Sequence, residues 1–254
     1  MKGKAIYSPT GKAGEYAKYA CNFYTGCSNA CDYCYCRKGV MAHTWSDKPH
    51  LKKCFESKFH AIFVFEQELK KNIKELKEHG LFFSFTTDPM LFEIYDLTME
   101  AAKVCHSYGV PVTILTKCTW FLNDFLGSPK DFATIGFTLT GHDELESHAS
   151  TNAKRIETMK ALHEAGFKTW ASIEPVITVT ESLEMMKESQ AYCGHFKIGL
   201  LAGKKYDNSE LQVMYSYANN FTSVPVTFKE SFLKQLGEPS WAKEVAQISE
   251  SHAL

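Results

Sequence analysis

The stretch YACNFYTGCSNACDYCYC, residues 19–36, joins a strand-like apolar run to a loop that is crowded with cysteines. Residues 26–36 alone carry four of the chain's nine cysteines. Thiols this close together either pair as disulfides, hold a metal or cluster, or lie together by chance. The choice depends on what the rest of the chain forms around them.

The composition is that of an ordinary globular protein. The chain has 254 residues, of which 44% are apolar and 22% charged, and its net charge is −1. This charge argues against a broad basic face for nucleic acid, although a local patch remains compatible with it. No apolar run approaches the roughly 20 residues of a membrane span, and the first residues lack the apolar stretch of a signal peptide. We therefore expect a cytoplasmic protein with no membrane partner, where clustered cysteines bind metal or do redox chemistry.

Strand-like and helix-like runs alternate along the chain. After residues 19–24, apolar runs recur at 81–87, 110–116, 132–140, 168–177 and 195–201. Apolar spacing between them predicts helices, one of which runs from Phe55 to Leu76 and is closed by Gly80. Such alternation is typical of an α/β fold with a parallel sheet. Six units favour a partial (β/α)6 TIM-type barrel. An open doubly wound sheet is the alternative, but its G-x-G-x-x-G motif is absent after the first run.

This interpretation divides the chain into three parts. Residues 1–18 form a basic N-terminal arm, and residues 19–206 form the barrel core. Residues 207–254 form a C-terminal helix and strand extension that caps the barrel. Within it Lys229, Lys234 and Trp241 either cap the barrel or touch substrate. Ligands of such folds bind at the carboxyl ends of the strands, so the cysteine loop lies at the functional end.

The cysteine spacing narrows the choice of ligand. Cys27, Cys31 and Cys34 read C-x-x-x-C-x-x-C, and Cys36 follows two residues later. A zinc site would need a second knuckle or a distant pair of histidines, and a two-cluster ferredoxin would need a second cysteine run. Neither is present. Three thiolates on one tight loop suit a cubane iron–sulfur cluster with one iron left open.

The motif YTGCSNACDYCYCR resembles the cluster loop of the radical S-adenosylmethionine (SAM) superfamily, whose signature is C-x-x-x-C-x-aromatic-C. It is most similar to the spore photoproduct lyase-like branch, although Thr25 and Asn29 replace the arginine and histidine of that branch. FTTDPMLFE (85–93), ILTKC (114–118) and SIEPVI (172–177) resemble later motifs of the same branch. The resemblance covers roughly residues 19–201.

The resemblance implies a [4Fe–4S] cluster, SAM as cofactor or cosubstrate, and reductive cleavage of SAM to a 5′-deoxyadenosyl radical. That radical would abstract hydrogen from a substrate, which is a nucleic acid by analogy with the lyase, or else a peptide or small molecule. An electron donor such as flavodoxin or ferredoxin is implied as a partner.

The resemblance also assigns site residues. Cys27, Cys31 and Cys34 would bind the cluster, and Cys36 would be a spectator thiol. Cys118 is a weak hydrogen-donor candidate, or else a small buried hydrophobic residue. The remaining candidates would bind the cofactor, with Tyr33 at the adenine and the Thr-Thr-Asp segment in place of the family's Gly-Gly-Glu: Tyr33, Thr86, Thr87, Asp88, Lys117, Thr138, Thr140, Arg155 and Glu174.

Several of these positions also have a purely structural interpretation. The Thr-Asp-Pro segment forms turns that cap helices, and Thr138 and Thr140 are ordinary strand residues. Two other functions stay open as well. One is a non-catalytic iron–sulfur protein for electron transfer or metal binding, and the other is a zinc-stabilised binding module.

Overall fold

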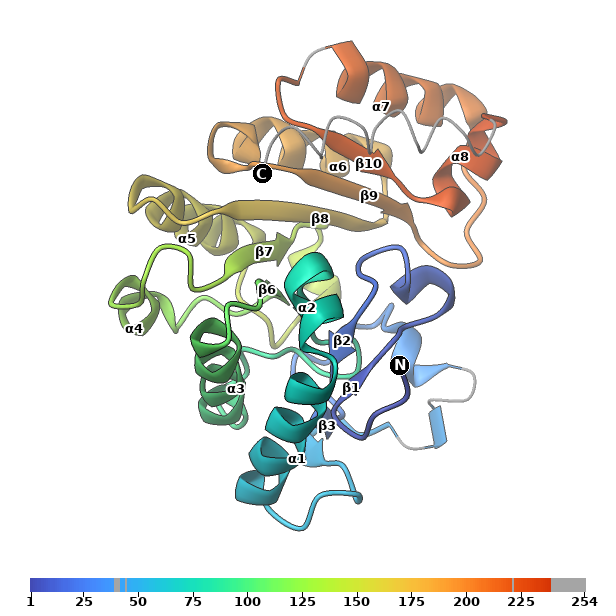
Figure 1. Ribbon diagram of the computed structural model, residues 1–254. Helices are drawn as coiled ribbons and strands as arrows, with labels where there is room; N and C mark the ends of the chain where they lie inside the picture. Colours follow the sequence, from blue (N-terminus) through green and yellow to red (C-terminus); the bar gives the residue numbers. More distant parts are fainter. Residues whose placement is uncertain (39–41, 44, 221, 239–254) are drawn as a thin grey trace. The chain divides into compact units, whose positions relative to one another are not determined.

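The computed structural model describes residues 1–38, 42–43, 45–220 and 222–238 (Figure 1). The chain forms two compact units. The first contains Met1–Ile135 and Glu146–Ser150, and the second contains Gly136–Leu145 and the chain from Thr151 onward. Trp241 of the predicted C-terminal cap lies outside the described residues.

The first unit is built on a sheet with the strand order β1-β2-β5-β6. These strands are Ile6–Tyr7, Ala20–Cys21, Leu81–Phe83 and Val112–Thr116. β1 is antiparallel to β2, whereas β2, β5 and β6 run parallel to one another. A separate antiparallel pair joins β3 (Tyr24–Thr25) to β4 (His50–Leu51).

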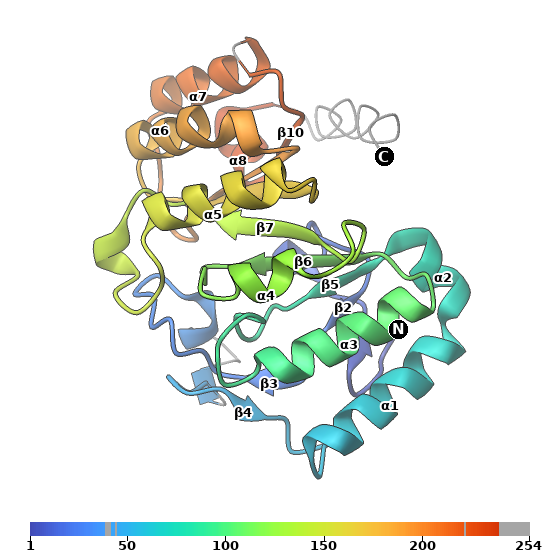
Figure 2. The same ribbon diagram turned by 90° about the vertical axis from the view of Figure 1, so that its left-hand side faces the viewer.

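The helices of the first unit are α1 (Lys58–Lys71), α2 (Ile73–His79), α3 (Tyr95–Ser107) and α4 (Leu122–Leu126). Short 3-10 turns occupy Gly11–Ala13 and Tyr35–Arg37. Figure 2 shows α1 and α3 running alongside each other on one side of the strands. The Ser57 side chain caps α1 by accepting a hydrogen bond from the His60 amide, as the N-cap rule predicts.

The predicted helix over residues 55–76 is two helices in the structure. Asn72 ends α1, and its side-chain amide donates to the Glu68 carbonyl oxygen at 2.7 Å. The side chain thus satisfies one of the carbonyls that a helix end leaves over. Phe59, which matched the apolar spacing, is 82% exposed, whereas Phe65 is fully buried.

The second unit has the strand order β7-β8-β9-β10. β7 (Thr134–Thr138) begins in the first unit and ends in the second, and the other strands are Thr169–Val176, Phe196–Leu200 and Val226–Phe228. β8, β9 and β10 are parallel. The helices are α5 (Asn152–Glu164), α6 (Val179–Ser189), α7 (Asn208–Asn220) and α8 (Glu230–Leu236), with 3-10 turns at Asp143–Leu145 and Gln190–Tyr192.

The predicted α/β alternation is confirmed. The six predicted strand runs correspond to β2, β5, β6, β7, β8 and β9. Sequence analysis did not predict β1, which pairs at the edge of β2, and β10 falls in the predicted C-terminal extension. None of the helices in the described part of the chain is long and apolar enough to cross a membrane.

Candidate functional site

The cysteine loop follows β2 and β3 and is held by backbone contacts at its start. The Gly26 amide donates to the Thr86 carbonyl, and the Cys27 amide donates to the Ser46 carbonyl, both at 3.1 Å. Gly26 has φ 96°, and a Cβ there would collide with the carbonyl oxygens of Ser46 and Lys48. Only glycine therefore lets the loop pass this close to the backbone of 46–48.

The three predicted ligands carry free thiols. Burial raises the pKa of Cys27 to about 12 and also raises the pKa of Cys31. A hydrogen bond from the Cys36 thiol lowers the pKa of Cys34 to about 6. The positive charge of Lys117 acts on all three thiols and favours their thiolate forms.

These residues fit an iron–sulfur cluster by the chemistry of their donors. Three soft sulfur donors lie on one loop, and one lysine close to all of them can offset the negative charge of a thiolate-bound cluster. Over the described ranges, no group of three or more His, Cys, Asp or Glu side chains is arranged to hold a single metal ion. A cubane cluster instead takes one thiolate at each iron that the protein ligates.

Asp88 ties the loop to the carboxyl ends of two strands. One carboxylate oxygen accepts from the Thr116 hydroxyl at 2.7 Å and the Met90 amide at 3.0 Å. The other accepts from the Asn29 side-chain amide at 2.8 Å and the Lys117 backbone amide at 2.7 Å. The predicted contact of Asp88 with the SAM ammonium stays untested, and within this chain the carboxylate already has four donors.

The two threonines before Asp88 differ. The Thr86 hydroxyl donates to the Tyr24 carbonyl at 2.6 Å and so holds the segment against β3. The Thr87 hydroxyl is buried and has no hydrogen-bond partner among the described residues. A buried hydroxyl without a partner is costly, so Thr87 is the member of this segment best suited to meet a ligand.

Asn22 of the motif supports the same segment. Its side-chain amide donates to the Tyr7 hydroxyl at 2.7 Å, and its carbonyl oxygen accepts from the Phe85 amide at 2.9 Å. The Phe85 carbonyl in turn accepts from the Tyr35 hydroxyl and from the Cys36 thiol, the latter at 3.6 Å. Cys36 is therefore packed against this segment, and its exposed fraction is 2%.

Glu146 is a site residue that sequence analysis missed. Its side chain is fully buried, and one carboxylate oxygen accepts a hydrogen bond from the Tyr33 hydroxyl. The Lys117 ammonium lies 3.9 Å from the same oxygen and 5.6 Å from the centre of the Tyr33 ring. A lone glutamate in the polar stretch HDELESHAS carries no sequence signal, because only the folded chain brings it to Tyr33.

Cys118 follows the last residues of β6. It is 7% exposed, and its amide donates to the Thr116 hydroxyl at 2.9 Å. This position is compatible with either predicted role, a hydrogen donor or a small buried side chain.

The other predicted residues lie in the second unit. Thr138 ends β7, and its carbonyl accepts from the guanidinium of Arg155, which is fully buried in α5, at 2.9 Å. The Thr140 amide donates to the Asn152 side chain at 2.9 Å. The Glu174 carboxylate, near the end of β8, pairs with the Lys229 ammonium at 2.7 Å. Each residue is thus at the strand end that the sequence predicted.

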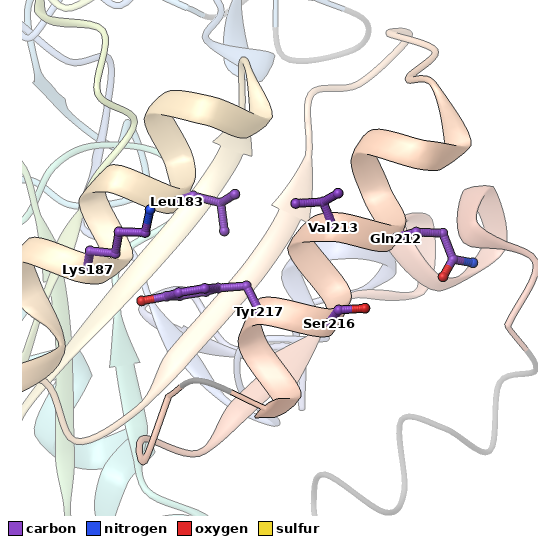
Figure 3. A pocket seen from close by; sticks show the side chains of 6 residues that line it. All are labelled: Leu183, Lys187, Gln212, Val213, Ser216 and Tyr217. Carbon is purple, nitrogen blue, oxygen red and sulfur yellow. The ribbon is translucent and has the colours of Figure 1, made fainter.

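A separate hollow of about 410 Å³ lies between α6 and α7. In Figure 3, Leu183 and Val213 extend toward each other across it, and Tyr217 and Lys187 line one side. None of the predicted site residues lines this hollow.

Comparison with known proteins identifies the nearest family pattern. The model of the radical SAM superfamily matches residues 21–193. The uncharacterized protein MJ0683 of Methanocaldococcus jannaschii is 29% identical over 187 residues, which are 70% of this chain and 66% of that protein.

Solved structures share the fold. A spore photoproduct lyase complexed with the dinucleoside spore photoproduct superposes with a TM-score of 0.57 at 14% identity, over 86% of this chain and 65% of the lyase. Streptococcus suis SuiB bound to S-adenosylmethionine gives a TM-score of 0.51 at 12% identity, over 67% of this chain and 43% of SuiB. The chain thus spans less than two thirds of each of these proteins. The likeness confirms the predicted fold class, an α/β partial barrel.

Proposed function

Because the chain belongs to the radical SAM superfamily, whose cofactors are a [4Fe–4S] cluster and SAM, we propose that it is an enzyme that cleaves SAM reductively. When bound, the reduced cluster and SAM supply a 5′-deoxyadenosyl radical, which takes a hydrogen atom from the substrate. The observation that supports this most directly is the loop itself, where three free thiols follow the first parallel strand with the superfamily spacing.

The chain's own residues would divide the work. Cys27, Cys31 and Cys34 would bind the cluster as thiolates, and Lys117 would favour that state by its charge. Asp88 would hold the loop to the strand ends rather than bind freely, while the Thr87 hydroxyl would meet the SAM ammonium. Tyr33, held by Glu146, would border the adenine.

Residues of the second unit would complete the cofactor site in this proposal. Thr138, Thr140, Arg155 and Glu174 lie at strand ends, where the fold places its ligands. Flavodoxin or ferredoxin would serve as the electron donor. A nucleic acid is one candidate substrate, supported by the structural likeness to a lyase complexed with a dinucleoside photoproduct.

The test is anaerobic reconstitution of the chain with iron and sulfide, followed by dithionite and SAM. Chromatography would follow 5′-deoxyadenosine. We expect the product with the wild type and with Cys54→Ala, which removes a free thiol outside the loop, and none with Cys31→Ala. An intact cluster that leaves SAM uncleaved would favour the non-catalytic electron-transfer alternative, and zinc alone in the site would refute the proposal.

A further inference from the structure

The sheet of the second unit has one apolar face and one polar face. Ile173, Ile198 and Phe228 are in register across β8, β9 and β10 and are all buried. The Phe228 ring lies 4.7 Å from the ring of Phe232 in α8 and 5.0 Å from that of Tyr215 in α7. This face therefore packs against the helices.

Side chains alternate between the faces of a strand, so the neighbouring residues point away from those helices. Ser172, Lys197 and Thr227 are in register on that opposite face. The Thr227 hydroxyl lies 3.0 Å from the His195 ring nitrogen, and the Lys197 ammonium lies 5.8 Å from the centre of the Trp170 ring. The face is polar where the inner layers of a barrel usually carry branched apolar side chains.

Toward the carboxyl ends of the strands, the same face carries the Glu174–Lys229 pair. The pairing of β8 with β9 is irregular here, because Glu174 and Pro175 both lie between the partners Ile173–Ile198 and Val176–Leu200, opposite Gly199 alone. Such a bulge re-aims a side chain, and bulges are common beside active sites. A Cβ at Gly199 would lie 2.6 Å from the Glu174 carboxyl carbon and 2.8 Å from the Lys229 side chain, so glycine leaves the space that the pair crosses.

These charges are costly where they stand. Lys229 is 3% exposed, and the Glu174 side chain is 16% exposed. Burial of a charge costs several kcal/mol, and an ion pair often no more than offsets that cost. With two lysines against one glutamate, the face carries a net positive charge. The fold gains nothing obvious from this, whereas a negatively charged ligand would.

We propose that this polar face, formed by Ser172, Glu174, Lys197, Thr227 and Lys229, binds an anionic group of the substrate, a carboxylate or a phosphate. The assignment of the ligand to the substrate rests on the proposed function. Lys197 and Lys229 donate to the anion, and the ammonium of Lys229 has three N–H donors, so it binds a ligand while it stays paired with Glu174. Glu174 is a positioning residue that orients Lys229 at the strand ends.

The test is calorimetric titration of the cluster-reconstituted chain with inorganic phosphate and, separately, with acetate, in the absence and presence of saturating SAM. We expect one of the two anions to bind with a millimolar dissociation constant that SAM leaves unchanged; which anion binds tells a phosphate ligand from a carboxylate. Lys197→Met should weaken this binding at least tenfold, whereas Lys168→Met, at an exposed lysine before β8, should not change it.

Lys229→Met leaves Glu174 without its cation and risks unfolding, so the paired variant Glu174→Gln/Lys229→Met removes both charges and should also lose binding. Thermal melting followed by circular dichroism checks that each variant is folded. The proposal is overturned if neither anion binds, if the folded variants bind as well as the wild type, or if SAM displaces the anion. Production of 5′-deoxyadenosine by the wild type is scored separately, so a failure here is distinct from a failure of the radical SAM assignment.

Discussion

Asn29 and Asp88 are 59 residues apart in the sequence, and in the structure their side chains are joined by a hydrogen bond of 2.8 Å. Asn29 belongs to the cysteine loop, and Asp88 follows β5. The same carboxylate also accepts from the ends of β6, so one buried group connects the loop to the sheet that carries it.

This network predicts the effect of Asp88→Asn. The substitution keeps the shape but places an NH₂ group opposite donors, either the Asn29 amide and the Lys117 amide or the Thr116 hydroxyl and the Met90 amide. Loss of hydrogen bonds to a charged acceptor costs about 2–3 kcal/mol. Urea unfolding should show that decrease, and iron bound after reconstitution should fall with it. Asp32→Asn, at an exposed position of the same loop, should change neither value.

Gly26→Ala should disrupt the loop. At φ 96° an added Cβ meets the carbonyl oxygens of Ser46 and Lys48, so the backbone has to move. We expect less than a tenth of the wild-type iron content after reconstitution. Gly11→Ala is a matched control, since Gly11 has φ 59° but no atom within 4 Å of the added carbon. Equal iron content in both variants would contradict the prediction.

Glu68→Gln should loosen the N-terminal strand. The Glu68 carboxylate accepts from three successive amides, those of Lys4, Ala5 and Ile6, at 2.6, 3.1 and 2.8 Å. Glutamine offers one fewer acceptor oxygen and no charge, so we expect a loss of about 1–3 kcal/mol in the free energy of unfolding. Glu100→Gln, on the exposed face of α3, serves as the control and should stay within about 0.5 kcal/mol. Faster amide exchange at residues 4–6 would locate the effect.

Glu146→Leu and Glu146→Gln should differ. Leucine removes the carboxylate that the Tyr33 hydroxyl and Lys117 share, and loss of one partner from a buried ion pair costs about 3–5 kcal/mol. Glutamine still accepts from Tyr33 and should lose less. Chemical denaturation measures both values, and indistinguishable variants would show that the carboxylate does not hold Tyr33.

Cys193 predicts a pH dependence. Burial raises the pKa of its thiol to about 12 from an ordinary value of 9.0. Between these pH values the unfolded chain releases the proton and the folded chain keeps it, so stability is present below pH 9 and is lost as pH rises. From pH 7 to pH 10 the wild type should lose about 1.4 kcal/mol more than Cys193→Ala. Parallel stability curves for the two proteins would refute this.

Secondary structure was predictable where the local pattern decides it. The apolar runs place β5 to β9, because strands covered on both faces need nearly continuous apolar residues. The break at Asn72 and the exposure of Phe59 were not predictable, because apolar spacing does not show which residues meet the core.

The sequence by itself determined the alternating fold and the three-thiol loop, since both depend on residues that are close together in the chain. Only the tertiary structure decided the partners of the buried charges. Glu146 lies 113 residues from Tyr33, and Lys229 and Glu174 are on different strands. A buried charge has to be paired, but no local pattern names its partner, because the strand order and register that bring the two groups together form only when the sheet does.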